Sequence, residues 1–142
     1  MKIGSTLENQ KIEKRIAITP EIAKKYISLG FDVHLSKNYA VHLGITDDDY
    51  KDTGVKFSDD EKEIINLVDI VVQLGLLSEE KSSAIKKDQT LIGVLNPYDN
   101  KEKLEVLKNK KINLFSLELL PRITRAQSMD ILSSQANLAG YK

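Results

Sequence analysis

Residues 69–74 read DIVVQL, and the centre of this stretch is continuously apolar. A strand of a parallel sheet is covered on both faces, so its side chains need not alternate between apolar and polar. Similar short apolar runs lie at 2–5, 31–35, 91–95 and 112–119. Helical patterns separate these runs, and that alternation is typical of a layered α/β domain.

We therefore predict a three-layer α/β fold, flavodoxin- or Rossmann-like, with a mainly parallel sheet of about five strands and helices on both faces. The predicted helices begin and end at recognisable caps. Thr19 stands just before a proline, and Ser58 has capping-box spacing to Glu61. Asn100 is expected to cap the last of these helices, and Gly30 to end the first in a left-handed conformation.

The composition limits the classes of function. The chain has 142 residues, enough for one compact domain, and 41% of them are hydrophobic. Lys plus Arg and Asp plus Glu both number 21, and a zero net charge disfavours nucleic-acid binding. No apolar run reaches about 18 residues, so we expect no direct membrane insertion. With no cysteine and only His34 and His42, no metal site is predicted.

The glycines do not form a phosphate-binding motif. They stand at positions 4, 30, 44, 54, 75, 93 and 140, and no two have the spacing of G-x-G-x-x-G. A P-loop is also absent from the sequence. The chain therefore lacks the glycine-rich turn and helix N-terminus on which a dinucleotide pyrophosphate usually lies.

Arg15 is the first candidate for a binding residue. It lies in EKRIAITP, residues 13–20, between a predicted strand and a capped helix. An arginine there can hold a carboxylate or phosphate anion through two parallel hydrogen bonds. The alternative is a surface arginine paired with Glu8 or Glu13, and the motif rules alone favour that alternative.

Residues 120–142, LPRITRAQSMDILSSQANLAGYK, hold the second group of candidates. Read as a helix from about residue 125, the segment has a thin apolar stripe formed by Met129, Leu132, Ala136 and Ala139. Arg122, Gln127 and Asp130 then converge at the helix N-terminus, where they could hold a planar amide ligand. A capping network of Thr124, with Asp130 paired to Arg122 or Arg125, explains the same residues equally well.

The segment 120–142 closely resembles the signature of NAD(P) transhydrogenase alpha subunits, in their NAD(H)-binding domain I. EKRIAITP matches an N-terminal element that this family shares with alanine dehydrogenase. The resemblance implies that residues 1–142 are the N-terminal subdomain of domain I. It also implies that about 125–142 begin an inter-domain helix, and that the Rossmann subdomain with the glycine-rich fingerprint is absent from this chain.

The resemblance assigns roles to four residues of the segment. Arg122, Gln127 and Asp130 correspond to the catalytic residues that hold the nicotinamide of NADH, and Ser133 to a further nicotinamide contact. Arginine and aspartate can grip a carboxamide, while Gln127 reaches toward the partner nucleotide. Direct hydride transfer needs two rings at near-attack distance and no acid or base.

The resemblance also implies an enzyme that couples hydride transfer from NADH to NADP⁺ to proton translocation. NAD(H) would bind in the full domain and NADP(H) on a partner beta subunit, with no metal. The implied assembly is a homodimer that contacts the beta subunit and a membrane domain, peripheral at the cytoplasmic face of the inner membrane. The isolated chain is expected to be inactive, because the adenosine and pyrophosphate contacts are missing.

Two other functions remain open. In an alanine dehydrogenase N-terminal domain, Arg15 would hold the pyruvate carboxylate. That family uses a lysine where Gln73 and Gly75 stand here, and a histidine where Asn96 stands. A non-catalytic interaction module is the other alternative, and it would dock through the small residues of the terminal helix.

Overall fold

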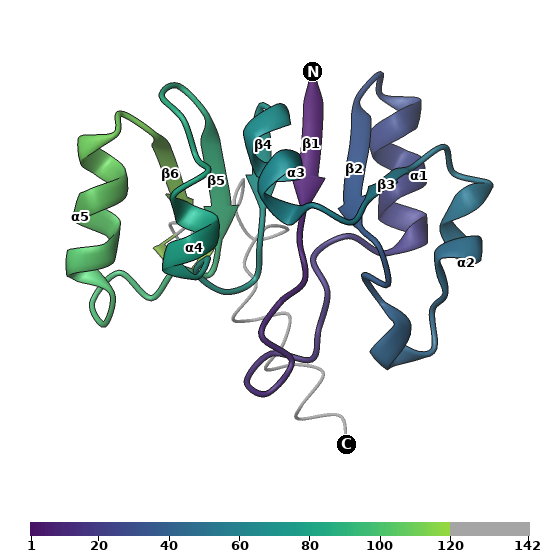
Figure 1. Ribbon diagram of the computed structural model, residues 1–142, viewed down its shortest axis with the longest axis horizontal. Helices are drawn as coiled ribbons and strands as arrows, with labels where there is room; N and C mark the ends of the chain where they lie inside the picture. The colour runs from purple at the N-terminus through teal and green to yellow at the C-terminus, as the bar shows by residue number, and fades with distance from the viewer. Residues whose placement is uncertain (120–142) are drawn as a thin grey trace, which may run out of the picture.

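Six parallel strands form one sheet in the computed structural model, which describes residues 1–119 (Figure 1). The strand order is β3-β2-β1-β4-β5-β6. The strands are β1 (Lys2–Ser5), β2 (Asp32–Ser36), β3 (Lys56–Ser58), β4 (Ile70–Val72), β5 (Thr90–Gly93) and β6 (Asn113–Ser116). The predicted α/β fold with a parallel sheet is therefore confirmed, but the expected number of about five strands was one too low.

The unpredicted strand is β3. It has three residues, KFS, and pairs only with β2, through His34↔Lys56, Leu35↔Phe57 and Ser36↔Ser58. Because Ser58 ends this strand, it cannot begin the next helix as predicted. Asp60 is the N-cap instead, and its carboxylate accepts hydrogen bonds from Lys62 N at 3.1 Å and Glu63 N at 3.2 Å.

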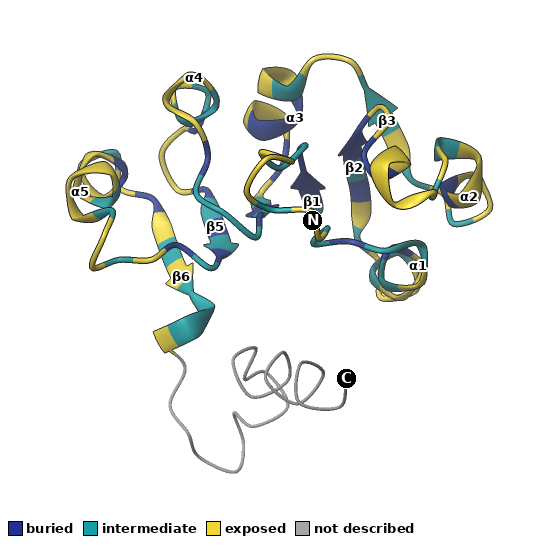
Figure 2. Ribbon diagram, turned by 90° about the horizontal axis from the view of Figure 1, so that it is seen from below, coloured by how far each residue is buried: buried dark blue, intermediate teal, exposed yellow. Residues whose placement is uncertain are grey.

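Helices cover both faces of the sheet (Figure 2). They are α1 (Pro20–Ser28), α2 (Asp47–Lys51), α3 (Glu61–Leu67), α4 (Glu79–Ser82) and α5 (Lys101–Asn109), with short 3₁₀ turns η1 (Val41–Leu43) and η2 (Leu117–Leu119). Right-handed crossovers place α1 on one face and α3, α4 and α5 on the other, because the order of the strands reverses after β3. Within residues 1–119, no helix combines the length and the apolar character needed to cross a membrane.

Each face has its own apolar core. The α1 face packs Ile3, Ile18, Ala23, Val33, Leu35, Tyr39, Ala40 and Tyr50. The opposite face packs Ile64, Ile65, Val68, Val71, Leu77, Ile85, Leu91, Leu95, Leu107 and Ile112. Consecutive residues of the buried run, Val71 and Val72, contribute to opposite faces. The uninterrupted apolar pattern at 69–74 is thereby explained.

The caps of α1 are those expected from the sequence. Thr19 Oγ1 accepts from Ile22 N at 3.3 Å, Pro20 is the first helical residue, and Gly30 has a left-handed φ of 96°. Asn100 stands at the N-cap position of α5 but makes no side-chain cap. Its Nδ2 instead donates to Leu95 O at 3.0 Å, so it closes the preceding loop rather than the helix.

The carboxyl ends of β4 and β5 approach too closely for a side chain at Gly93. A Cβ built at this position would overlap the main-chain carbonyl oxygen of Gln73, which a flexible side chain cannot relieve by moving. At Gly75, by contrast, the nearest atom to a built Cβ is Glu8 Oε1 at 3.4 Å, an ordinary contact distance. A methyl group at Gly93 would therefore collide with the main chain, whereas one at Gly75 would contact only a side chain.

We therefore expect Gly93→Ala to lower the free energy of unfolding by about 3 kcal/mol, because the strands must separate to admit the methyl group. Gly75→Ala is the matched control and should change it by less than about 1 kcal/mol. Urea denaturation followed by circular dichroism measures both values. Equal effects of the two substitutions would contradict the close approach at Gly93.

Tyr39 joins the loop that follows β1 to the sheet. Its ring is 1% exposed, and its hydroxyl oxygen accepts from Ala17 N at 3.1 Å and Ile18 N at 3.3 Å. The same hydroxyl lies 2.8 Å from Ser5 Oγ, which itself donates to Gln73 Oε1 at 3.2 Å. Since the Ser5 proton is used there, Tyr39 is the donor to Ser5. Burial raises the pKa of Tyr39 to about 12, from an ordinary 10.0.

Tyr39→Phe should lower the free energy of unfolding by about 2 kcal/mol at pH 7, because it removes the acceptor of one buried and one part-buried N–H group. Because the folded-state pKa lies above the unfolded value, the contribution of Tyr39 is complete below pH 10 and is lost as pH rises through about 12. Urea denaturation should therefore show a smaller difference in the free energy of unfolding between the wild type and Tyr39→Phe at pH 11 than at pH 7. Tyr98→Phe, at a side chain that is 90% exposed, is the control.

Candidate functional site

The centre of the sheet holds a topological switch point. From β1 the chain proceeds to β2 and β3 on one side, then returns to β4 on the other side of β1. In open parallel sheets, ligands bind in the crevice outside the carboxyl ends of the two strands at such a point. The carboxyl ends of β1 and β4, with the loop of residues 6–19, are therefore the candidate site (Figure 1).

Gln73 stands just after β4, is 2% exposed and lines a pocket of this crevice together with Glu8 and Lys81. Its Oε1 accepts from Thr6 N at 2.6 Å, from Thr6 Oγ1 at 3.2 Å and from Ser5 Oγ at 3.2 Å. Its Nε2 donates to Thr6 O at 3.3 Å and to Glu8 Oε2 at 2.7 Å. The amide therefore satisfies the first main-chain groups beyond β1, which no strand can reach.

The carboxylate of Glu8 accepts hydrogen bonds from the two main-chain amides that follow β4. Its Oε2 accepts from Leu74 N at 3.0 Å and its Oε1 from Gly75 N at 2.9 Å. Burial raises the pKa of the Glu8 carboxyl, while the hydrogen bonds from Gly75 and Leu74 favour the ionised form and act in the opposite direction. Two consecutive N–H groups at a switch point could receive a ligand anion, but here they hold a carboxylate of the protein itself.

Glu61 and Lys81 hold the Leu7 peptide group from both sides. Leu7 N donates to Glu61 Oε2 at 2.8 Å, and Lys81 Nζ donates to Leu7 O at 2.7 Å. The two side chains also form an ion pair at 3.1 Å, and they are only 27% and 20% exposed. The loop after β1 is therefore fixed by α3 and α4 as well as by β4.

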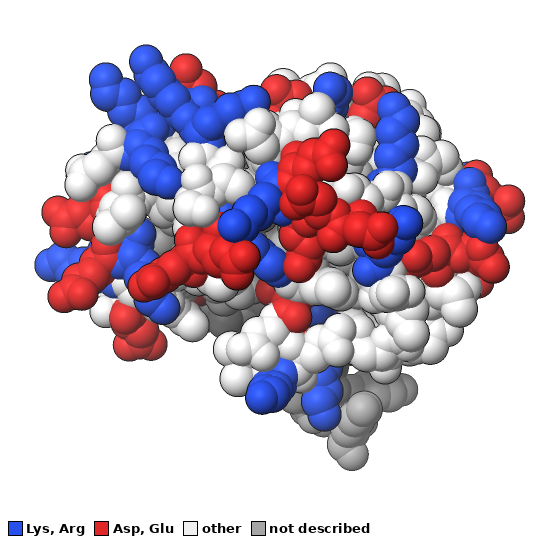
Figure 3. Space-filling view, in the orientation of Figure 1, with Lys and Arg blue, Asp and Glu red and all other residues white. Residues whose placement is uncertain are grey.

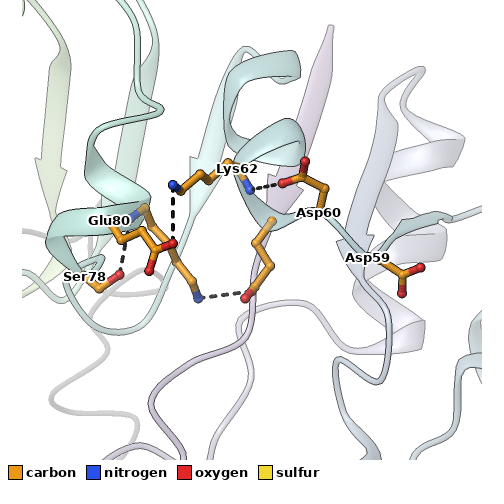
Figure 4. A pocket seen from close by; sticks show the side chains of 7 residues that line it. Asp59, Asp60, Lys62, Ser78 and Glu80 are labelled. Carbon is orange, nitrogen blue, oxygen red and sulfur yellow. Dashed lines mark hydrogen bonds and ion pairs between the residues drawn. The ribbon is translucent and has the colours of Figure 1, made fainter.

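An open polar pocket lies beside this pair, lined by Asp59, Asp60, Glu61, Lys62, Ser78, Glu80 and Lys81 (Figure 4). Its lysines are paired, Lys62 with Glu80 at 3.3 Å and Lys81 with Glu61. Acidic and basic side chains are mixed on this face of the molecule, with acidic ones gathered near its centre (Figure 3). Among residues 1–119, no group of three His, Cys, Asp or Glu is arranged to hold a metal ion. We assign no ligand to this pocket.

Arg15 is bound to Glu13, as the alternative interpretation of EKRIAITP predicted. Arg15 Nε and one terminal nitrogen donate to the two carboxylate oxygens of Glu13, each at 2.8 Å. This interaction lowers the pKa of Glu13 and raises the pKa of Arg15. The side chain of Arg15 is 55% exposed and that of Glu13 is 20% exposed.

The loop carrying Arg15 is also tied to η1. His42 Nε2 donates to Lys14 O at 2.7 Å, and His42 Nδ1 accepts from Gln10 Nε2 at 3.1 Å. A neutral imidazole satisfies both contacts, because one ring nitrogen donates and the other accepts. His42 thus links the loop to η1 through both of its ring nitrogens.

The predicted residues Arg122, Gln127, Asp130 and Ser133 lie outside the described residues, and their roles stay predictions. Sequence reasoning missed Gln73 and Glu8 as members of the candidate site, and it missed the contact of Glu118 with the end of β5. Glu118, in η2, accepts from Leu95 N and Asn96 N at 3.3 Å each. The signal in the sequence was a polar residue near the end of an apolar run, at positions 8, 73 and 118. The sequence does not show which main-chain or side-chain groups these residues contact.

Comparisons with known proteins agree with this architecture. Residues 5–139 match the family described as alanine dehydrogenase/PNT, N-terminal domain. The chain is 39% identical over 146 residues to an NAD(P) transhydrogenase subunit alpha protein of Rickettsia prowazekii and 40% identical over 147 residues to that of Rhodospirillum rubrum. Each alignment covers 100% of this chain and 38% of the relative.

Solved structures have the same fold. The transhydrogenase of Sinorhizobium meliloti superposes with a TM-score of 0.92 at 34% identity, over 99% of this chain and 42% of that one. An L-alanine dehydrogenase superposes with a TM-score of 0.77 at 22% identity, over 83% of this chain and 32% of that one, which supports the fold alone. The chain thus spans well under half the length of these relatives. It belongs to the alanine dehydrogenase/PNT N-terminal domain family.

Proposed function

We propose that this chain is the N-terminal part of the NAD(H)-binding domain of a transhydrogenase alpha subunit. The complete enzyme would transfer hydride from NADH to NADP⁺ and couple the transfer to proton translocation. The observation that carries the proposal is the whole-length similarity to transhydrogenase, 34% identity over 99% of the chain at a TM-score of 0.92. The proposed assembly is a homodimer with an NADP(H)-binding beta subunit and a membrane domain, at the cytoplasmic face of the inner membrane.

The crevice does not fit the pyrophosphate of a dinucleotide. No glycine-rich turn joins β1 to α1, which are separated by the loop 6–19. The amides at the end of β4 already donate to the carboxylate of Glu8, whose negative charge would repel a phosphate. We infer that residues 1–119 do not hold the phosphates, and that the rest of the full domain does so.

The nicotinamide end is assigned to residues outside the described part of the chain. In this proposal Arg122 and Asp130 grip the carboxamide, Ser133 adds a contact, and Gln127 reaches toward the NADP(H) subunit. The nicotinamide supplies the hydride chemistry when NADH is bound. These residues would orient the nicotinamide ring, because hydride transfer between two rings requires near-attack distance but no proton transfer by the protein.

Alanine dehydrogenase activity is less well supported. Gln73 has a neutral amide whose oxygen and nitrogen both bond to the protein, and Lys81 is committed to Leu7 and Glu61. Arg15 is bound to Glu13. A neutral amide thus stands where that family uses a lysine, and we do not propose this reaction.

In the full-length alpha subunit combined with its NADP(H)-binding partner, Gln127→Ala should slow single-turnover hydride transfer about 100-fold, because a small displacement between the rings is costly. The dissociation constant of NADH should change by less than about threefold, since most contacts to the nucleotide remain. Asn109→Ala, an exposed amide in α5, is the control. An unchanged transfer rate in Gln127→Ala would contradict the proposed role.

The isolated 142-residue chain should neither bind NADH tightly nor transfer hydride. Its residues 1–119 contain no glycine-rich phosphate-binding turn, and contacts to the nicotinamide alone contribute too little binding energy to hold the nucleotide. Isothermal titration calorimetry and a transfer assay with added NADP(H) subunit measure both properties. Substantial transfer by the isolated chain would contradict this prediction, and specific binding of another protein would favour the interaction module.

A further inference from the structure

Lysines gather at the amino ends of β5 and β6. The turn before β5, together with the end of α5 and the turn before β6, carries Lys86, Lys87, Lys108, Lys110 and Lys111. The two turns lie side by side, because Asp88 N donates to Lys111 O at 3.1 Å. Figure 3 shows basic side chains at this corner of the molecule, in the upper left of the view, over the end of α5. Asp88 is the single acidic residue of the two turns.

The charge of this lysine cluster is not neutralised. Within residues 1–119, none of the five ammonium groups forms an ion pair, whereas Lys37 pairs with Asp59 at 3.0 Å and Lys62 with Glu80 at 3.3 Å. Like charges so close together repel one another, and only water and salt screen them. The cluster therefore presents a positive surface on a chain whose net charge is zero.

An apolar groove lies beside the cluster, between α4 and α5. It has a volume of about 340 Å³, and its walls include Leu76, Leu77, Val106 and Leu107, with Lys103 and Lys110. Val106 is 59% exposed, while Leu77 and Leu107 are 5% and 2% exposed. Among its lining residues the groove has one carboxylate, that of Glu79.

Lys110 belongs to both the groove and the cluster. Its Nζ donates to Ser82 O at 3.2 Å, which joins the end of α5 to the end of α4. This hydrogen bond holds the ammonium group at the groove and uses one of its three N–H donors. The other two donors can bind a carboxylate of a ligand whose apolar part lies in the groove.

We propose that the groove and the lysine cluster form a docking surface for an acidic segment of another protein. A bulky apolar side chain of the segment enters the groove, and the carboxylates that flank it bind the lysines. An apolar centre with a charged rim is the usual arrangement of a protein–protein interface. The cluster lies at the amino ends of the strands, opposite to the crevice, so this inference stands apart from the proposed function.

Other anionic partners fit this surface less well. Binding to a bilayer requires apolar side chains that enter the lipid, whereas Leu77 and Leu107 are buried in the walls of a groove. Binding to nucleic acid favours arginines that contact base edges and aromatic rings that stack on bases. Residues 76–89 and 101–112 contain neither.

The test of the lysines uses the full-length protein and a fluorescein-labelled peptide of sequence EEELFEEE, with the dissociation constant measured by fluorescence anisotropy. Lys87→Glu combined with Lys111→Glu should weaken binding about tenfold or more. Lys11→Glu combined with Lys24→Glu changes the net charge equally at exposed lysines outside the cluster. This matched control should change the dissociation constant by less than about twofold.

The test of the groove removes apolar contacts from either partner. The peptide EEEGGEEE keeps the charges and should bind about fivefold or more weakly than EEELFEEE. Val106→Ser should weaken the binding of EEELFEEE about threefold. Val41→Ser, at an exposed valine of η1, is the control and should leave binding unchanged.

The possible outcomes decide the proposal. Equal weakening by the two double variants would mean that the peptide responds only to net charge, and it overturns the proposal, as does absence of binding at about 1 mM peptide. Tighter binding of phosphatidylglycerol vesicles or of duplex DNA to the same lysines also overturns it. Should circular dichroism show that a glutamate variant does not fold, Lys87→Gln with Lys111→Gln decides, against Lys11→Gln with Lys24→Gln. Hydride transfer by the complete assembly tests the proposed function separately.

Discussion

The Gln73 amide satisfies main-chain groups at the switch point between β1 and β4, where the sheet cannot do so. β1 and β4 diverge from each other beyond their carboxyl ends, because the loops that follow them lead to opposite faces. Thr6 N and Thr6 O therefore lie buried without a strand partner, and an unpaired buried amide costs about 1–3 kcal/mol. The Gln73 side chain supplies an acceptor to Thr6 N and a donor to Thr6 O. These two hydrogen bonds compensate for the burial of its amide. Tyr39, Ser5 and Glu8 extend the same network outward into the loop.

This network decides what the crevice can do. Carboxylates of the chain already occupy the amides after β4 and β5, and the partly buried Glu61–Lys81 pair is engaged by one peptide group. A fully satisfied network is rigid, since each member has partners in only one arrangement. The polar groups around Gln73 and Lys81 are thus bonded largely to one another. That property agrees with the division of roles in the proposed function.

Much of the fold could be predicted from local pattern, and most of the crevice could not. Apolar runs placed five strands, and Thr19 and Gly30 marked α1, because those signals arise from neighbouring residues. β3 was missed because its three residues pair only with β2. The predicted cap at Asn100 was wrong because its side chain bonds to Leu95 O in the preceding loop. Gln73 meets residues more than 60 positions away, a distance that no local pattern encodes. Arg15 was expected to pair with Glu8 or Glu13, and the pair that forms is with Glu13, two residues away.

The carboxylates of Glu8 and Glu118 link neighbouring strands beyond their carboxyl ends. Parallel strands end at one edge, so segments that leave neighbouring strands start close together. Each would be free to turn about its own backbone unless a side chain joined it to the next strand. Glu8 and Glu118 provide that link over two amides each, which restricts rotation as a single hydrogen bond cannot. Within residues 1–119, the ends of neighbouring strands are therefore held to one another by carboxylates as well as by the hydrogen bonds of the sheet.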